Sequence, residues 1–188
     1  MYDPSLRHTS VAAILAGVLI FAGQAGELVF GSPSNLVNAL FVTLSGLGVA
    51  ALVTAIWRVG RLVTTRLGRI AWRVCVAGVV SLAAFAVQAL VTVILTGDIP
   101  ENFVLFGLGF LLLFVGHLLI APGLRNALGR GWMLPLVGAA GILVAITLDV
   151  DPIHDIGLFV FEGAWVALGI ALLRAEHRRQ PVTALALV

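Results

Sequence analysis

The sequence predicts an all-α membrane protein with six transmembrane helices in one bundle and both termini in the cytoplasm. Two observations carry this prediction: six long apolar stretches, and a set of arginines that falls on one side of them. Apolar residues make up 61% of the 188 residues and charged residues 11%, whereas soluble proteins average about 45–50% and about 25%. Because the six stretches use most of the chain, we expect a single membrane domain over residues 1–188.

The expected spans are residues 9–30, 35–57, 70–96, 102–121, 132–148 and 156–173. A hydrocarbon core about 30 Å thick requires about 20 apolar residues per helix, which each stretch approaches or exceeds. The first stretch follows Arg7 and contains the small-x-small sequence 23–25, as a secretory signal would, but its apolar run continues to Phe30. We therefore expect an uncleaved first helix.

The first three spans end at residues typical of helix ends. The first is followed by the turn sequence Gly-Ser-Pro-Ser at 31–34, and Ser34 or Asn35 can cap the second helix. The second ends at Trp57, an aromatic residue of the kind enriched at membrane interfaces. The third begins near Trp72 and stops at a second turn sequence, Gly-Asp-Ile-Pro at 97–100. These signals predict short connections between antiparallel neighbours.

The last three spans are bounded in the same way. Pro122 and Gly123 end the fourth, since proline and glycine both disfavour helix continuation. Trp132 begins the fifth at the interface that Trp57 and Trp72 also occupy. Asp151 before Pro152 is a typical start for the sixth, with an N-cap residue followed by proline at the first helical position.

All eleven basic residues are arginines, and their positions determine the expected orientation. They precede the first span, fill the second and fourth connections and follow the sixth, at Arg7, Arg58, Arg61, Arg66, Arg69, Arg73, Arg125, Arg130, Arg174, Arg178 and Arg179. Cytoplasmic loops carry the Lys/Arg excess of membrane proteins, so we expect these segments in the cytoplasm. The complete absence of lysine is typical of a GC-rich, bacterial genome, which makes the cell membrane the expected location.

The arginines of the second connection are expected to contact lipid or another protein. They are Arg58, Arg61, Arg66, Arg69 and Arg73. We expect them to face anionic lipid headgroups or a cytoplasmic partner. Arginines spread over four short segments do not indicate nucleic-acid binding.

Two glutamates fall inside the apolar stretches, where an ionisable side chain is energetically costly and is usually functional. Glu162 would lie roughly 12 Å from the outer end of the sixth span, and Glu27 close to the outer end of the first. No arginine falls in the outer half of any span, so each carboxylate needs a proton, a cation or a partner subunit. Gln24, Asn38 and Gln88 lie at similar depth. We expect these five residues to outline an outward-facing pocket. The alternative is that each amide or acid makes one interhelical hydrogen bond.

The densest polar cluster contains Asp149, Asp151, His154 and Asp155. Carboxylates and an imidazole could bind a divalent metal such as Ca²⁺, Mg²⁺ or Zn²⁺, but their spacing matches no specific motif. Helix capping, the helix dipole and the charge of an outside loop explain the same residues, and we favour this explanation over metal binding. Asp155 also lies seven residues before Glu162, on the same helix face.

We predict no resident cofactor. His117 is the one histidine well inside a span, and no second histidine lies at a matching depth for haem, so we expect it to be a packing residue. The single cysteine, Cys75, excludes an internal disulfide. Glycines within the spans, such as Gly23, Gly48 and Gly141, mark candidate helix contacts.

Three functions are compatible with these features, and a non-enzymatic one is favoured because no familiar catalytic motif is present. The first is a small transport or permeation protein that binds a cation, a proton or a small solute, with Glu162 as the binding carboxylate. The second is an accessory or assembly subunit of a larger membrane complex, or a homo-oligomer, in which neighbouring chains supply partners for the carboxylates. The third is an intramembrane metal-dependent hydrolase that uses the 149–155 cluster together with Glu162 to activate water on a lipid substrate.

Overall fold

The computed structural model describes residues 4–31, 34–97, 103–147 and 153–179. These residues are 96% helical and include no strand, which confirms the all-α class. The long helices are α1 (Pro4–Phe30), α2 (Asn35–Val59), α3 (Arg66–Thr96), α4 (Val104–Ile120), α6 (Leu134–Thr147) and α7 (Ile153–Arg179). The short helical turns are η1 (Gly60–Leu62), η2 (Ala121–Leu124), α5 (Arg125–Leu128) and η3 (Gly129–Met133).

Side-chain caps and a left-handed glycine set several of these helix boundaries. The Ser34 hydroxyl, one of the two caps predicted for α2, accepts a hydrogen bond from the Val37 backbone N–H at 3.3 Å. Thr65 caps α3 in the same way, through the Gly68 N–H at 3.1 Å. At the other end of α3, Gly97 has φ of 85°, a conformation that glycine adopts without strain.

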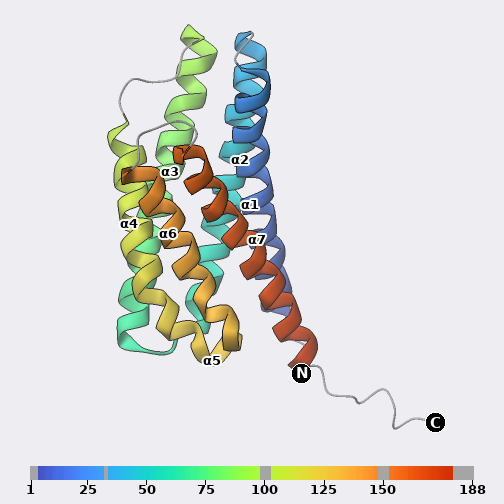
Figure 1. The fold of residues 1–188 in the computed structure, drawn as a ribbon, viewed down its shortest axis with the longest axis vertical. Helices are drawn as coiled ribbons and strands as arrows, with labels where there is room; N and C mark the ends of the chain where they lie inside the picture. Colours follow the sequence, from blue (N-terminus) through green and yellow to red (C-terminus); the bar gives the residue numbers. More distant parts are fainter. Residues whose placement is uncertain (1–3, 32–33, 98–102, 148–152, 180–188) are drawn as a thin grey trace, which may run out of the picture.

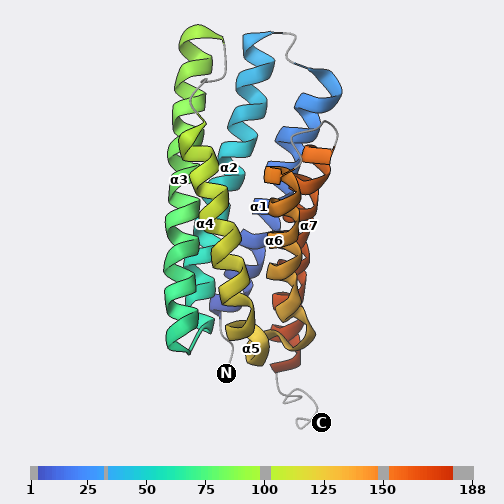
Figure 2. The same cartoon turned by 60° about the vertical axis from the view of Figure 1, so that its left-hand side comes forward.

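The six long helices form a closed ring in which neighbours run in opposite directions (Figures 1 and 2). The order around the ring is α1, α2, α3, α4, α6, α7 and back to α1, and each helix packs against the two beside it. Glycines lie in these seams: Gly48 of α2 meets Ile20 of α1, and Gly141 of α6 meets the backbone of Gly157 on α7. Small residues let helices in lipid approach closely, so they account for the tight ring.

The helices have the composition of a membrane protein. Five described segments are long and apolar enough to cross a membrane: Leu6–Phe30, Leu36–Leu62, Arg66–Thr96, Val104–Thr147 and Ile153–Arg178. The fourth of them contains both α4 and α6, which lie antiparallel and are joined by the helical turns η2, α5 and η3 (Figure 1). Large apolar side chains also cover much of the outer surface of the ring, as lipid contact requires.

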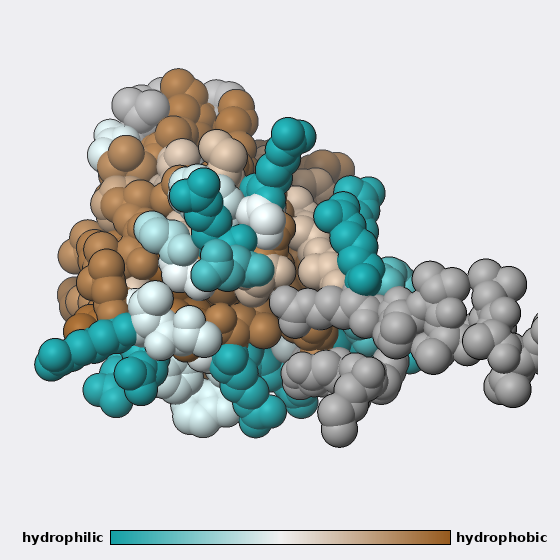
Figure 3. Space-filling view, turned by 90° about the horizontal axis from the view of Figure 1, so that it is seen from below, coloured by the Kyte–Doolittle hydropathy of each residue, from teal (hydrophilic) through white to brown (hydrophobic). Residues whose placement is uncertain are grey.

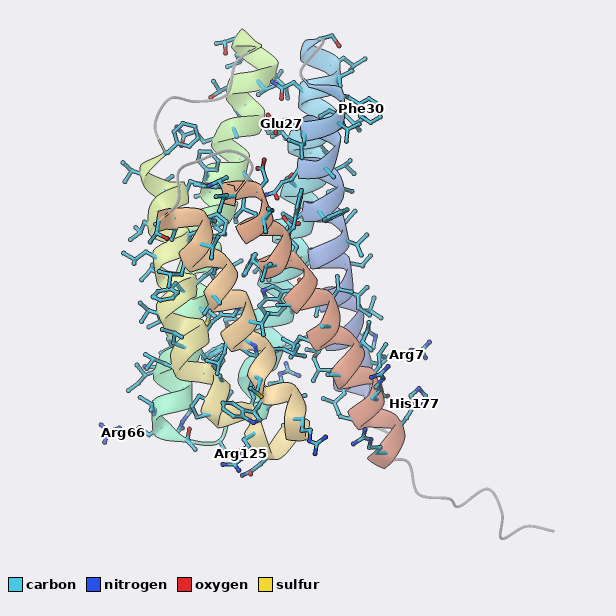
Figure 4. The ribbon with its side chains drawn as sticks, in the orientation of Figure 1. Arg7, Glu27, Phe30, Arg66, Arg125 and His177 are labelled. Atoms are coloured by element: carbon cyan, nitrogen blue, oxygen red, sulfur yellow. The ribbon has the colours of Figure 1, made fainter. Side chains whose placement is uncertain are left out.

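One end of the ring carries the arginines, and we call it the arginine end. Its described members are Arg7, Arg58, Arg61, Arg66, Arg69, Arg73, Arg125, Arg130, Arg174 and Arg178. Figure 3 views this end directly and shows hydrophilic side chains gathered on it, and Figure 4 shows Glu27 near the opposite end. Apolar side chains fill the ring next to the arginine end, including Leu52, Val79 and Leu113.

Candidate functional site

A cavity of about 550 Å³ occupies the half of the ring opposite the arginine end. Five helices line it: α1, α2, α3, α4 and α7. It is partly open on the side away from the arginine end, where the lining residues Glu27 and Leu28 are exposed, and is bounded toward the arginine end by Ile20, Val49 and Leu82. Beyond them lies the packed core, so the cavity is a vestibule closed on one side.

Among the described residues, the acidic side chains that line this vestibule come from two helices. Glu27 projects from α1, and Asp155 and Glu162 project from α7. The two helices pack closely because α1 has glycine where it meets α7: a Cβ at Gly17 would lie 2.5 Å from the Glu162 backbone oxygen. The α1–α7 seam therefore determines where the carboxylates lie. No arginine is among the side chains that line the cavity in the described part of the chain.

Glu162 is the most deeply buried of these acids. Only 1% of its surface is exposed, and neither carboxylate oxygen has a hydrogen-bond partner among the described residues. The buried side-chain oxygen of Gln24, which lines the same cavity, is also without a donor. An ionised carboxylate in apolar surroundings is strongly disfavoured unless it is paired. Glu162 therefore calls for a proton or for a cation in the cavity.

The other two acids lie at the start of α7 and near the end of α1, closer to the opening. Glu27 is exposed, and its charge and that of Asp155 repel one another. His154, next to Asp155, donates its Nδ1–H to the Ala145 carbonyl of α6 at 2.8 Å. That bond holds the start of α7 against α6.

A continuous run of phenylalanine rings forms much of the apolar wall. Phe103 contacts Phe85 with ring centroids 5.8 Å apart, Phe85 contacts Phe106 at 5.2 Å, and Phe106 contacts Phe110 at 4.7 Å. Phe110 then meets Phe161 at 6.0 Å. The run of rings therefore extends from the start of α4 to α7, where Phe161 and the next residue, Glu162, both line the cavity.

The structure brings together only part of the predicted pocket. Gln24, Glu27 and Glu162 line the cavity, whereas Asn38 and Gln88 are not among its lining residues. Asn38 is buried, and its amide nitrogen donates a hydrogen bond to the Gly97 carbonyl at 3.5 Å. This long hydrogen bond is of the interhelical kind that we expected as the alternative to a place in the pocket. Gln88 is half-buried on α3. The depth of a residue along its helix follows from the sequence, but the rotation of the helix about its axis depends on the neighbouring helices. That rotation leaves Asn38 and Gln88 out of the cavity lining.

Sequence reasoning missed the aromatic wall and the part that α4 plays in it. Phe103, Phe106 and Phe110 follow one another at intervals of three and four residues, which places them on one helix face. That periodicity was available as a signal, but apolar residues in an apolar span give no sign of facing a cavity instead of lipid. Ser45 of α2 also lines the cavity and was not singled out.

The proposed metal cluster falls partly outside the described residues, since Asp149 and Asp151 lie there. Within residues 4–31, 34–97, 103–147 and 153–179, no group of three or more His, Cys, Asp or Glu side chains is placed to hold a metal. His117 is buried and donates its Nδ1–H to the Leu113 carbonyl at 2.7 Å. Its ring packs edge-on against Phe161 and Trp165, as a packing residue would.

The basic residues of the second connection differ in exposure. Arg58 is half-buried and lines a groove between α1 and α2 at the arginine end, together with Arg7 and His8. The other four arginines are exposed, namely Arg61, Arg66, Arg69 and Arg73. That these arginines contact lipid headgroups or a cytoplasmic partner remains a prediction.

The chain matches no known protein family model, and neither a curated protein nor a solved structure is similar enough to count as a match. Its function must therefore be argued from the cavity itself.

Proposed function

We propose that the protein is a six-span protein of the bacterial cell membrane that binds and transports a cation or proton through the vestibule. In this proposal α4 and α6 each cross the membrane, both termini are cytoplasmic, and the vestibule faces the exterior. The gathering of arginines at one end supports this orientation, because cytoplasmic segments carry the arginine excess.

The proposal rests mainly on the burial of Glu162 and on the lack of partners for its carboxylate oxygens. This carboxylate lines the cavity, is almost fully buried and has two oxygens without donors in the described structure. A side chain of this kind inside a membrane helix is a functional residue by default, and its natural partners are a proton and a cation. Glu27 and Asp155 nearer the opening add negative charge that attracts the cation.

Competition between proton and cation at one carboxylate would couple their movements. When a cation pairs with Glu162, the proton leaves, and when the cation departs the carboxyl is protonated again, since the ionised form is disfavoured alone. Apolar side chains such as Leu52, Val79 and Leu113 close the path toward the arginine end. Release on that side therefore requires the helices to shift, as alternating-access transporters do.

The proposal is tested in proteoliposomes that contain entrapped pyranine and an interior more acidic than the exterior. Na⁺, K⁺, tetramethylammonium or ethidium is added outside, and alkalinisation of the interior reports exchange of a proton for the cation. We expect at least one of these cations to give a signal with wild-type protein and none to do so with Glu162→Gln.

Glu176→Gln is the matched control. Glu176 is also a buried glutamate of α7, with 7% of its surface exposed and one unpartnered oxygen, but it does not line the cavity. This variant should exchange protons like the wild type. The proposal is overturned if Glu162→Gln retains the wild-type signal, or if no cation moves protons in wild-type vesicles.

A further inference from the structure

The walls of the vestibule are too apolar for a small inorganic cation to be its best ligand. A bare metal ion is held by several oxygen ligands at once, six to eight in the case of Ca²⁺. Here the acids are spread from the opening to the base, and the surface between them consists largely of phenylalanine rings and aliphatic side chains. A small ion paired with Glu162 would leave most of this surface without a contact.

The phenylalanine rings of the cavity wall can bind a cation that carries apolar groups. Phenylalanine rings attract cations through their faces when the charge lies within about 6 Å of the ring centre. The rings of Phe103, Phe85, Phe106, Phe110 and Phe161 form an unbroken series, and Phe161 and Glu162 both line the cavity. An organic cation can use both parts of the site, placing its charge at the carboxylate and its apolar groups against the rings.

The size of the cavity agrees with this chemistry. Pockets for organic ligands usually measure about 300–1,000 Å³ and are mainly apolar with few polar groups, and this one measures about 550 Å³. The buried side-chain oxygens of Glu162 and Gln24, which have no partner among the described residues, also favour a positively charged occupant.

We infer that the ligand is a hydrophobic, aromatic organic cation, held by Glu162 at the base of the vestibule and by the phenylalanine series along its wall. This inference rests on the proposed function and narrows its substrate class. It makes the aromatic side chains determinants of specificity, with Phe106 central because its ring contacts those of Phe85, Phe103 and Phe110.

The inference is tested by binding of radiolabelled tetraphenylphosphonium to purified full-length protein in detergent, measured by equilibrium dialysis. We expect saturable binding by the wild type, at least about tenfold weaker binding by Glu162→Gln, and about three- to tenfold weaker binding by Phe106→Leu. Phe114→Leu is the matched control, because Phe114 lies about two turns further along α4 and does not line the cavity. It should bind like the wild type.

A second measurement needs no variant and so does not depend on variant folding. Dicyclohexylcarbodiimide modifies carboxyl groups in apolar surroundings, and peptide mass spectrometry locates the product. Tetraphenylphosphonium should slow modification of Glu162 in wild-type protein, whereas an equal concentration of NaCl should not. Equal protection by NaCl, or no protection by either, contradicts the inference.

The possible failures can be told apart. If Na⁺ or K⁺ exchanges for protons through Glu162 while tetraphenylphosphonium does not bind, the inference about the ligand is wrong and the proposed function stands. If tetraphenylphosphonium binds equally well to wild type and to Glu162→Gln, and no cation exchanges for protons, the proposed function is wrong as well. Equal binding by Phe106→Leu and wild type contradicts the aromatic part alone.

Discussion

Gly17 of α1 lies against the backbone of Glu162 on α7, so close that a Cβ at Gly17 would be 2.5 Å from the Glu162 carbonyl oxygen. The same Cβ would lie 2.6 Å from a methyl carbon of Val166. Real Cβ atoms do not make contacts this short, so any larger residue at position 17 must separate the two helices. The residue that supports the proposed function is thus positioned by a glycine on the neighbouring helix.

Replacement of Gly17 by alanine should therefore destabilise the protein and weaken cation binding together. Overpacking of a tight core typically costs about 1–3 kcal/mol, and here the obstacle is partly backbone, which cannot rotate away. Thermal unfolding in detergent should show a lower midpoint for Gly17→Ala. Gly163→Ala is the matched control, because a Cβ at Gly163 meets nothing within 4 Å and alanine is the better helix former. An unchanged midpoint for Gly17→Ala would show that the α1–α7 seam is looser than described.

The α2–α3 seam contains an interhelical hydrogen bond that can be tested separately from the cavity. The Trp72 indole N–H donates to the Ile56 carbonyl at 2.9 Å. Bonds of this type in membrane proteins contribute about 0.6–1.7 kcal/mol, so Trp72→Phe should lower the free energy of unfolding by roughly 1 kcal/mol. Trp57→Phe should change the free energy of unfolding much less, because the Trp57 side chain is 55% exposed and phenylalanine keeps an aromatic ring next to Trp72, whose ring centroid lies 5.4 Å away. Equal effects of the two substitutions in denaturant titrations would mean that the hydrogen bond contributes nothing measurable.

Much of the helix layout could be predicted because apolar length and capping are local properties. Ser34 caps α2 where the turn sequence predicted, and the described arginines gather at one end. The structural boundaries differ mainly at the arginine end. There α7 continues to Arg179, beyond the expected span end at 173, because its last residues include strong helix formers. Likewise α3 begins at Arg66 instead of residue 70, since Thr65 supplies a cap.

The composition of the site was less predictable, because it depends on how each helix is rotated in the ring. Glu162 and Gln88 were placed at comparable depth, yet only Glu162 lines the cavity. Rotation is set by close contacts such as those of Gly17 and Gly48, whose partners lie on other helices. Those pairings cannot be read from one sequence. The phenylalanines were missed for a related reason, since lipid-facing and cavity-facing aromatic residues have the same hydrophobic signature.

The membrane topology can be tested with single cysteines in a Cys75→Ala background, which removes the one, buried, native thiol. Thr64, Asn126 and Thr147 are exposed residues at helix ends or in connections, which makes them suitable positions. With the arginine end in the cytoplasm, a membrane-impermeant maleimide should label Thr147→Cys in intact cells. It should label Thr64→Cys and Asn126→Cys only after permeabilisation.

These three positions test the number of spans and the orientation in the membrane separately. Asn126 lies in α5 and Thr147 ends α6, so they fall on opposite faces of the membrane if α6 crosses it. Labelling of both from the same side would mean that the segment Val104–Thr147 does not form two spans. Labelling of Thr64→Cys and Asn126→Cys, but not Thr147→Cys, in intact cells would instead reverse the orientation. The vestibule would then open to the cytoplasm, and Glu162 would receive its cation from inside the cell.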